Sequence, residues 1–243
     1  MKTVIVYKWA RNGEDAAVRS DGSVDWRNAK MTPSEDDFAA LEAAKAIAEK
    51  DRIIGLTIGD GDASWVLARG VKESVSIVDA PKFVDNASTA SIIAAAVKNI
   101  GDDTDVVVIG DSIEYSGVPV ALAGMLEWPI LTNVDSACVA DGKIQIQRKQ
   151  GSDVQTINIA APAVIAVKAA SPEKKAPGMK EQLLARKRPV TKQTLTDIGA
   201  ESGEKMSRVG TRLPETTAAR VFNGDPEAVA AQLIAVLREE CVL

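Results

Sequence analysis

Short apolar runs alternate with longer stretches of helical periodicity along the first half of the chain. The runs are rich in Val and Ile and are too short for helices, which predicts strands buried on both faces. They are Thr3–Tyr7, Arg52–Ile58, Ser74–Val78 and Val106–Ile109. Asp36–Glu49 and Asn86–Ile100 repeat apolar residues at helical spacing between them. This alternation predicts a mostly parallel sheet with helices on both faces.

The stretch before the first of these helices has the composition of a helix start. It offers hydroxyl and acidic cap candidates between Thr32 and Asp37, with Pro33 near the first turn. Acids at such a position favour the helix dipole. We therefore expect them to act as caps rather than as catalysts.

The pattern changes after Trp128. Asp141-Gly142 is a strong turn signal between Ala137–Val139 and Lys143–Arg148, which predicts a β-hairpin. We expect Gln155–Ile159 and Ala163–Val167 to continue the hairpin, so that the sheet carries an antiparallel extension.

The last quarter of the chain is more polar. Met179–Arg188 predicts a short basic helix, and an extended tail is expected beyond Thr191. Asp225 before Pro226 predicts the cap of a final helix that runs through Leu237. We expect an α/β nucleotide-binding-like domain over residues 1–189 and a partner-contacting arm and helix over residues 190–243.

One strand-to-helix connection has the features of a ligand site. The apolar strand at Val106–Ile109 is followed by a loop with small residues and free backbone amides, and then by an Ala/Leu-rich helix. Such loops hold phosphates in open α/β sheets, because they lie at helix N-termini. The candidate residues are Gly110, Ser112, Ser116 and Gly117. The alternative is an ordinary connection without a ligand.

A second glycine-rich turn, Gly59-Asp60-Gly61, follows the Arg52–Ile58 strand. With Asp79 about 20 residues further on, it resembles a dinucleotide fingerprint. Ser64 stands where the third glycine is expected, and the aspartates of the turn would repel a pyrophosphate. These departures disfavour a true fingerprint.

Composition excludes several function classes. The chain has no histidine, which disfavours His-based triads and zinc chemistry. Its net charge of −5 argues against nucleic-acid binding. No apolar run approaches the roughly 18 residues of a membrane helix, and no signal-peptide pattern follows Met1. We expect a cytoplasmic protein without membrane insertion.

Taken together and in order, these segments resemble the small (beta) subunit of the electron transfer flavoproteins. The similarity covers residues 1–189 and, less clearly, the tail. It is carried by Tyr7-Lys8 after the first strand, Pro33 with Asp36-Asp37-Phe38-Ala39, Leu67-Ala68-Arg69-Gly70-Val71, Asp105–Gly117 with Leu122–Pro129, and Pro162–Val167 with Ala185–Pro189.

The resemblance implies an adenine-nucleotide α-hydrolase-like, Rossmann-like fold and an electron carrier subunit that is not itself an enzyme. Such a subunit binds AMP, or a second FAD in bifurcating members, and supports the FAD of an alpha subunit. By position, the cofactor-binding residues would be Val6, Lys8, Thr32, Pro33, Ile58, Gly59, Asp60, Gly110, Asp111, Ser112, Ser116 and Gly117. Met179 falls at the anchor that docks on a partner flavin-dependent dehydrogenase.

Departures from the family pattern fall mainly on the nucleotide site. Thr32 replaces an asparagine, and the loop after Gly110 is shorter and lacks the family's repeated aspartates and glutamine. Two other functions stay open: a stand-alone adenine-nucleotide regulator resembling the universal stress proteins, and a small dehydrogenase using Gly59, Gly61 and Asp79.

Overall fold

The computed structural model describes residues 1–49, 51–59, 61–81, 84–168, 176–203, 206–207, 209–216 and 218–242. Contacts divide the chain into two units. The larger unit comprises Met1–Ala17 and Asp25–Val209, and the smaller comprises Val18–Val24 and Gly210–Leu243.

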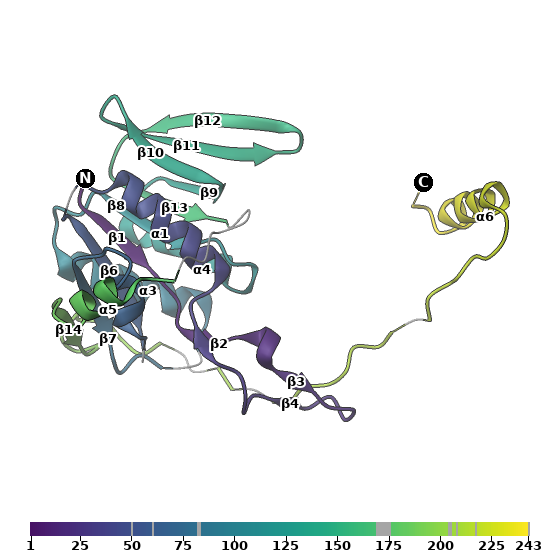
Figure 1. Cartoon of the computed structure of the whole chain (residues 1–243), viewed down its shortest axis with the longest axis horizontal. Helices are drawn as coiled ribbons and strands as arrows, with labels where there is room; N and C mark the ends of the chain where they lie inside the picture. The colour runs from purple at the N-terminus through teal and green to yellow at the C-terminus, as the bar shows by residue number, and fades with distance from the viewer. Residues whose placement is uncertain are drawn as a thin grey trace. The chain divides into compact units, whose positions relative to one another are not determined.

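The larger unit is built on a seven-stranded sheet in which every strand pairing is parallel (Figure 1). The strand order is β14 (Val190–Gln193), β7 (Glu73–Ile77), β6 (Ile53–Ile58), β1 (Thr3–Val6), β8 (Val106–Gly110), β13 (Ala163–Val167) and β9 (Ile130–Val134). The predicted α/β fold with a mostly parallel sheet is confirmed.

Helices cover the sheet on both faces, and alternate residues of each strand point to opposite faces because the side-chain period of a strand is two. Val107 and Ile109 of β8 pack with α3 (Asn86–Ile100) and α4 (Gly117–Leu126). Val106 and Val108 pack on the other face with α1 (Glu35–Ile47), where α2 (Ala63–Leu67) also lies. The apolar runs therefore reflect burial on both faces, as the sequence indicates.

The antiparallel part forms a separate sheet of β10 (Ser136–Ala140), β11 (Lys143–Gln150) and β12 (Asp153–Ile159). The predicted hairpin is confirmed, and both turn residues, Asp141 and Gly142, have positive φ values of 50° and 73°. The expectation that Ala163–Val167 continues this hairpin is wrong. As β13 it runs parallel between β8 and β9, because its five buried residues fill a central position of the main sheet.

Between β1 and α1 the chain makes an excursion of short elements. β2 (Ala10–Arg11) pairs with β5 (Met31–Thr32), and β3 (Ala17–Val18) pairs with β4 (Val24–Asp25). A 3-10 turn, η1 (Gly13–Asp15), lies between β2 and β3. This excursion returns the chain to the start of α1.

The segment after α5 (Met179–Ala185) is more ordered than the expected tail. β14 adds an edge strand to the main sheet, beside β7. Leu195 and Ile198 then bury their side chains in the core under α3 and α4, with exposures of 8% and 9%. The extended, polar character predicted beyond Thr191 is therefore wrong for residues up to Ala200, which pack on the larger unit.

The smaller unit contains α6 (Pro226–Glu239). Its predicted cap is confirmed, since the Asp225 carboxylate accepts a hydrogen bond from the backbone N–H of Glu227 at 3.1 Å and Pro226 opens the helix. The structure describes every residue of α6, and none of them is buried. None of the helices among the described residues has both the length and the apolar character needed to cross a membrane.

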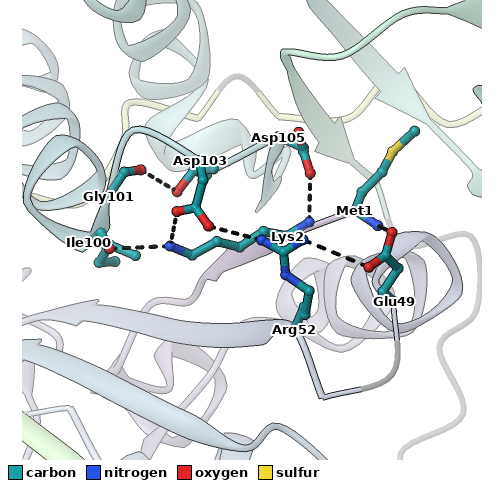
Figure 2. Close-up of polar contacts among 9 residues, drawn as sticks. Met1, Lys2, Glu49, Arg52, Ile100, Gly101, Asp103 and Asp105 are labelled. Atoms are coloured by element: carbon teal, nitrogen blue, oxygen red, sulfur yellow. Dashed lines mark hydrogen bonds and ion pairs between the residues drawn. The ribbon is translucent and has the colours of Figure 1, made fainter.

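At the amino ends of β1, β6 and β8, charged groups tie the strands together (Figure 2). The Lys2 ammonium lies 2.5 Å from the Asp103 carboxylate, which is also 2.9 Å from the Arg52 guanidinium. The Lys2 backbone N–H donates to Asp105 at 2.8 Å, and the N-terminal ammonium of Met1 lies 3.0 Å from Glu49. These contacts lie at the amino ends of the strands, and the candidate site lies at their carboxyl ends.

Candidate functional site

The carboxyl ends of β1 and β8 meet at a switch in chain direction. From β1 the chain passes through α1 to β6 on one side, whereas from β8 it passes through α4 to β9 on the other side. Open α/β sheets bind ligands in the crevice beyond such a switch, because the two connections diverge there. We call Lys8, Asp37 and the loop Gly110–Gly117 the switch-point site.

Lys8 follows β1 and reaches across to the loop after β8. Its ammonium lies 2.7 Å from a carboxylate oxygen of Glu114 and 3.9 Å from the centre of the Tyr115 ring. Both partners belong to η2 (Ile113–Tyr115). The Lys8 ammonium thus lies at the switch-point site, where the Glu114 carboxylate is its ion-pair partner.

Asp37 forms the buried floor beside Lys8. Its carboxylate accepts hydrogen bonds from the Ser34 N–H and hydroxyl, each at 2.8 Å, and from the Lys8 N–H at 3.3 Å. Ser34 in turn accepts from the Asp37 N–H, which completes a capping box at the start of α1. Burial raises the pKa of Asp37 to about 6, and its hydrogen bonds oppose that rise.

Glycine is required where β8 ends. A Cβ on Gly110 would lie 3.0 Å from the Asp36 Cβ and 3.2 Å from the Asp36 backbone carbon. The start of α1 therefore packs directly on the loop. The next residue, Asp111, donates its N–H to Val167 at 2.7 Å and accepts from the Asn133 N–H at 2.6 Å. One oxygen of its carboxylate thereby holds the end of β9.

The loop ends at the N-terminus of α4. Ser112 and Ser116 occupy the N-cap positions of η2 and α4, and neither side chain makes a capping hydrogen bond to a described residue. The first N–H groups of a helix have no partner within the helix, and they favour negative charge. Gly117 follows, and a Cβ there would lie 2.7 Å from the amide nitrogen of Asn86 at the start of α3. Two helix N-termini thus flank this side of the site.

The other predicted nucleotide-site residues lie around these groups. Val6 is buried at the end of β1, and Thr32 pairs with Ala10 before the buried Pro33. Ile58 and Gly59 end β6, where the Gly59 N–H donates to the Ile77 carbonyl at 2.7 Å. Asp60 lies outside the described residues.

Met179 belongs to a different surface. It begins α5, is 79% exposed, and is followed on this helix by Leu183 and Leu184, which are 54% and 45% exposed. Helix α5 contacts α2. The structure therefore does not bring Met179 together with the switch-point residues.

The carboxylate of the fingerprint-like segment has a structural partner. Asp79 accepts a hydrogen bond from the Leu195 N–H at 2.7 Å, which fixes the turn after β14. A dinucleotide site would need this carboxylate for a ribose hydroxyl. The arrangement disfavours a dehydrogenase built on Gly59, Gly61 and Asp79.

Three residues of the switch-point site were not singled out from the sequence as binding residues: Asp37, Glu114 and Tyr115. The Ser34-x-x-Asp37 spacing is a capping-box signal that identifies Asp37 as a cap, but not its contact with Lys8. Glu114 and Tyr115 lie inside the predicted loop, and no local pattern connects them to Lys8.

A family model that is described as an electron transfer flavoprotein domain matches residues 23–198 of the chain. The chain belongs to this family. The matched residues run from β4 to the turn after β14 and include α1, the loop after β8 and α5. The resemblance noted from the sequence is thus confirmed. Electron transfer flavoprotein domain proteins are flavin-associated electron carriers rather than enzymes, and they work with a second subunit and with dehydrogenases.

Proposed function

We propose that this chain is the small (beta) subunit of a heterodimeric electron transfer flavoprotein. It holds an adenine nucleotide, AMP or the adenylate half of a second FAD, at the switch-point site, and it supports the FAD of an alpha subunit. The complex shuttles electrons between a flavin-dependent dehydrogenase and an acceptor. The flavin supplies the redox chemistry, while this chain binds and orients.

The observation that carries the nucleotide proposal is the convergence of Lys8 with the N-terminus of α4. Lys8 provides a positive charge, and Ser116 leaves the first amides of a ten-residue helix without a side-chain cap among the described residues. Phosphates bind where helix N–H groups and a cation meet. Gly110 and Gly117 let the starts of α1 and α3 pack directly on this loop, because a Cβ at either position would meet Asp36 or Asn86.

Glu114 sets the condition for binding. Its carboxylate holds the Lys8 ammonium, so a phosphate must displace it. The side chain of Glu114 is 71% exposed and can turn into water at little cost. We infer that Glu114 serves as a stand-in anion for Lys8 in the nucleotide-free chain.

The partner proposal rests on unpaired apolar surface. Leu233 and Ile234 on α6 are 44% and 43% exposed, and Met179 is exposed on α5. A free helix of this length is marginal in water unless a partner covers its apolar side. We propose that α6 docks on the alpha subunit and that Met179 anchors the dehydrogenase.

The test is co-expression of the chain with its alpha subunit, followed by denaturation and chromatography of the released nucleotides. We expect a yellow 1:1 complex that releases FAD together with AMP or a second equivalent of FAD. A colourless complex, or a stable homodimer of this chain that carries adenylate alone, would contradict the proposal and favour the stand-alone regulator.

The site is tested by Lys8→Gln in the complex. Loss of a charged hydrogen-bond donor should weaken AMP binding by about tenfold, measured by calorimetry. Lys45→Gln is the matched control, because Lys45 pairs with Glu42 on the outer surface of α1. Equal AMP affinity in the two variants would show that Lys8 does not contact the nucleotide.

A further inference from the structure

A cavity of about 430 Å³ lies between the carboxyl ends of β6 and β7, the start of α2 and the end of α5. Three cations and two hydroxyls line it together with one carboxylate: Arg186, Arg188, Lys192, Ser64, Ser76 and Asp62. We call it the edge cavity. None of its charged residues belongs to the switch-point site.

The floor of the edge cavity is a row of polar residues on adjacent strands. Ser76 pairs with Lys192 across β7 and β14, so both side chains point to the same face of the sheet. The Ser76 side chain is 4% exposed. Its hydroxyl lines the cavity and can donate a hydrogen bond to a ligand oxygen there.

The cations are free to bind a ligand. Neither the Arg186 guanidinium nor the Lys192 ammonium has a carboxylate within ion-pair distance in the described part of the chain. Arg188 plays a different role, because its guanidinium donates to the backbone carbonyls of Leu67 and Val71 and so joins α2 to β14. It adds positive charge from a fixed position.

Asp62, the one carboxylate among the described lining residues, already accepts hydrogen bonds. Asp62 caps α2 by accepting from the Ser64 N–H at 2.8 Å and from the Ser64 hydroxyl at 2.7 Å. Among the described residues that line the cavity, three cations outnumber one carboxylate, so their summed charge is positive. Excess positive charge over a hydroxyl-lined floor favours a dianion.

We propose that the edge cavity is a second anion site that binds a phosphate group, either inorganic phosphate or a small phosphomonoester. Arg186 and Lys192 clamp the phosphate oxygens, and the Ser76 hydroxyl donates to one of them. The site shares Gly59 with the residues predicted for the nucleotide, but it contains neither Lys8 nor the loop Gly110–Gly117.

The experiment is a phosphate titration of the full chain monitored by backbone amide NMR. One arm uses inorganic phosphate and the other uses glycerol 3-phosphate, each against sodium chloride at matched ionic strength. We expect saturable shifts of the amides of Ser64, Ser76 and Lys192 in at least one arm, and none with chloride. The arm with the tighter binding identifies the source of the phosphate group.

Variants locate the binding. Arg186→Gln combined with Lys192→Gln should weaken phosphate binding by more than about tenfold, since both charged donors are lost. Lys187→Gln is the control, because Lys187 carries the same charge on the same turn but does not line the cavity. Both exposed positions tolerate glutamine, and circular dichroism verifies the fold.

Lys8→Gln separates the two sites. It should leave the phosphate shifts at the edge cavity unchanged even where it abolishes AMP binding. The proposal is overturned if neither arm saturates, if the double variant binds as tightly as Lys187→Gln, or if Lys8→Gln removes the shifts.

Discussion

Asp37 shows how one residue can serve the fold and the site together. Its carboxylate closes the capping box of α1 and accepts the N–H of Lys8, so the helix start and the end of β1 are locked to each other. It is 3% exposed. A buried carboxylate whose charge is disfavoured leaves a signature in the pH dependence of stability.

Burial raises the pKa of Asp37 from 3.8 to about 6, so between these values the folded chain binds more protons than the unfolded chain. This contribution stabilises the fold at low pH and is lost as pH rises through about 6. Asp37→Asn keeps an acceptor oxygen but does not titrate. We expect the unfolding free energy of the wild type to fall relative to the variant between pH 4 and pH 7, by about 3 kcal/mol. Urea unfolding at each pH measures it.

Asp85→Asn is the contrasting variant. Asp85 caps α3, and hydrogen bonds from Ser88 lower its pKa. The contribution of Asp85 to stability is present above the unfolded pKa of 3.8 and is lost as pH falls through the lower folded pKa. The unfolding free energy of the wild type should therefore rise relative to this variant as pH rises. If the unfolding free energy changes with pH in the same direction for both comparisons, the burial of Asp37 does not cause the pH dependence.

Glu114 permits a second test at the scale of a residue, on the premise that the switch-point site binds nucleotide. Glu114→Gln removes the carboxylate that competes for Lys8, so AMP binding should tighten by about threefold to tenfold. Stability should change by less than about 1 kcal/mol, because the ion pair is at the surface. Calorimetry with AMP checks the first expectation. Weaker binding would mean that Glu114 itself contacts the nucleotide.

At the scale of the element, two glycines have different roles. Gly110 allows β8 and α1 to pack closely, whereas Gly124 only adds backbone freedom to α4. Gly110→Ala would place a Cβ 3.0–3.2 Å from Asp36, so the start of α1 must shift by a few tenths of an ångström, and we expect a loss of about 1–3 kcal/mol. Gly124→Ala in the last turn of α4 meets nothing within 4 Å and should stabilise by about 1 kcal/mol. Chemical unfolding of both variants tests the pair. Equal effects would show that Gly110 does not hold the two elements in contact.

The ends of individual helices could be predicted from the sequence. Both ends of α3 are read from the sequence, because an apolar period of helical spacing runs without interruption from Asn86 to Ile100. The start of α6 follows equally from Asp225 and Pro226. These are local signals, and local chemistry decides them.

Which strands pair, and in which direction, depends on contacts between segments that are distant in sequence. Ala163–Val167 reads as a buried strand, but five apolar residues carry no information on direction, and the neighbouring hairpin suggested the wrong one. Val190–Gln193 has one apolar residue in four and becomes a strand because β7 offers an open edge. The contact between Lys8 and Glu114 is likewise set by the adjacency of β1 and β8, not by a motif.

At the scale of the whole molecule, charges at the amino edge of the sheet join segments that are distant in sequence (Figure 2). A hydrogen bond from Lys2 lowers the pKa of Asp103, and the N-terminal ammonium lowers that of Glu49. Both contributions are present above the unfolded pKa values and are lost as pH falls through the folded ones. The network therefore stabilises the sheet at neutral pH.

Asp103→Asn should lower the melting temperature at pH 7 in low salt, because Lys2 loses its ion pair and Arg52 keeps only Glu49, at 3.7 Å. The difference from the wild type should shrink in about 1 M salt and below pH 4, where screening or protonation already removes the interaction. Glu42→Gln, which breaks only a local pair on α1, is the control. Thermal unfolding followed by circular dichroism measures both. A salt-independent loss would point to lost packing instead.

The smaller unit has apolar side chains on α6 that a partner could cover. All residues of α6 are described and none is fully buried, so much of its apolar surface has no cover in the chain by itself. If α6 docks on an alpha subunit, Leu233→Glu with Ile234→Glu should abolish co-purification of that subunit, because two desolvated glutamates would face an apolar surface. Gln232→Glu adds one charge at an exposed polar position and should leave the complex intact. Both variants should unfold like the wild type when alone. A complex that survives the double substitution would assign α6 another role and would leave α5, with Met179, as the surface that holds the alpha subunit.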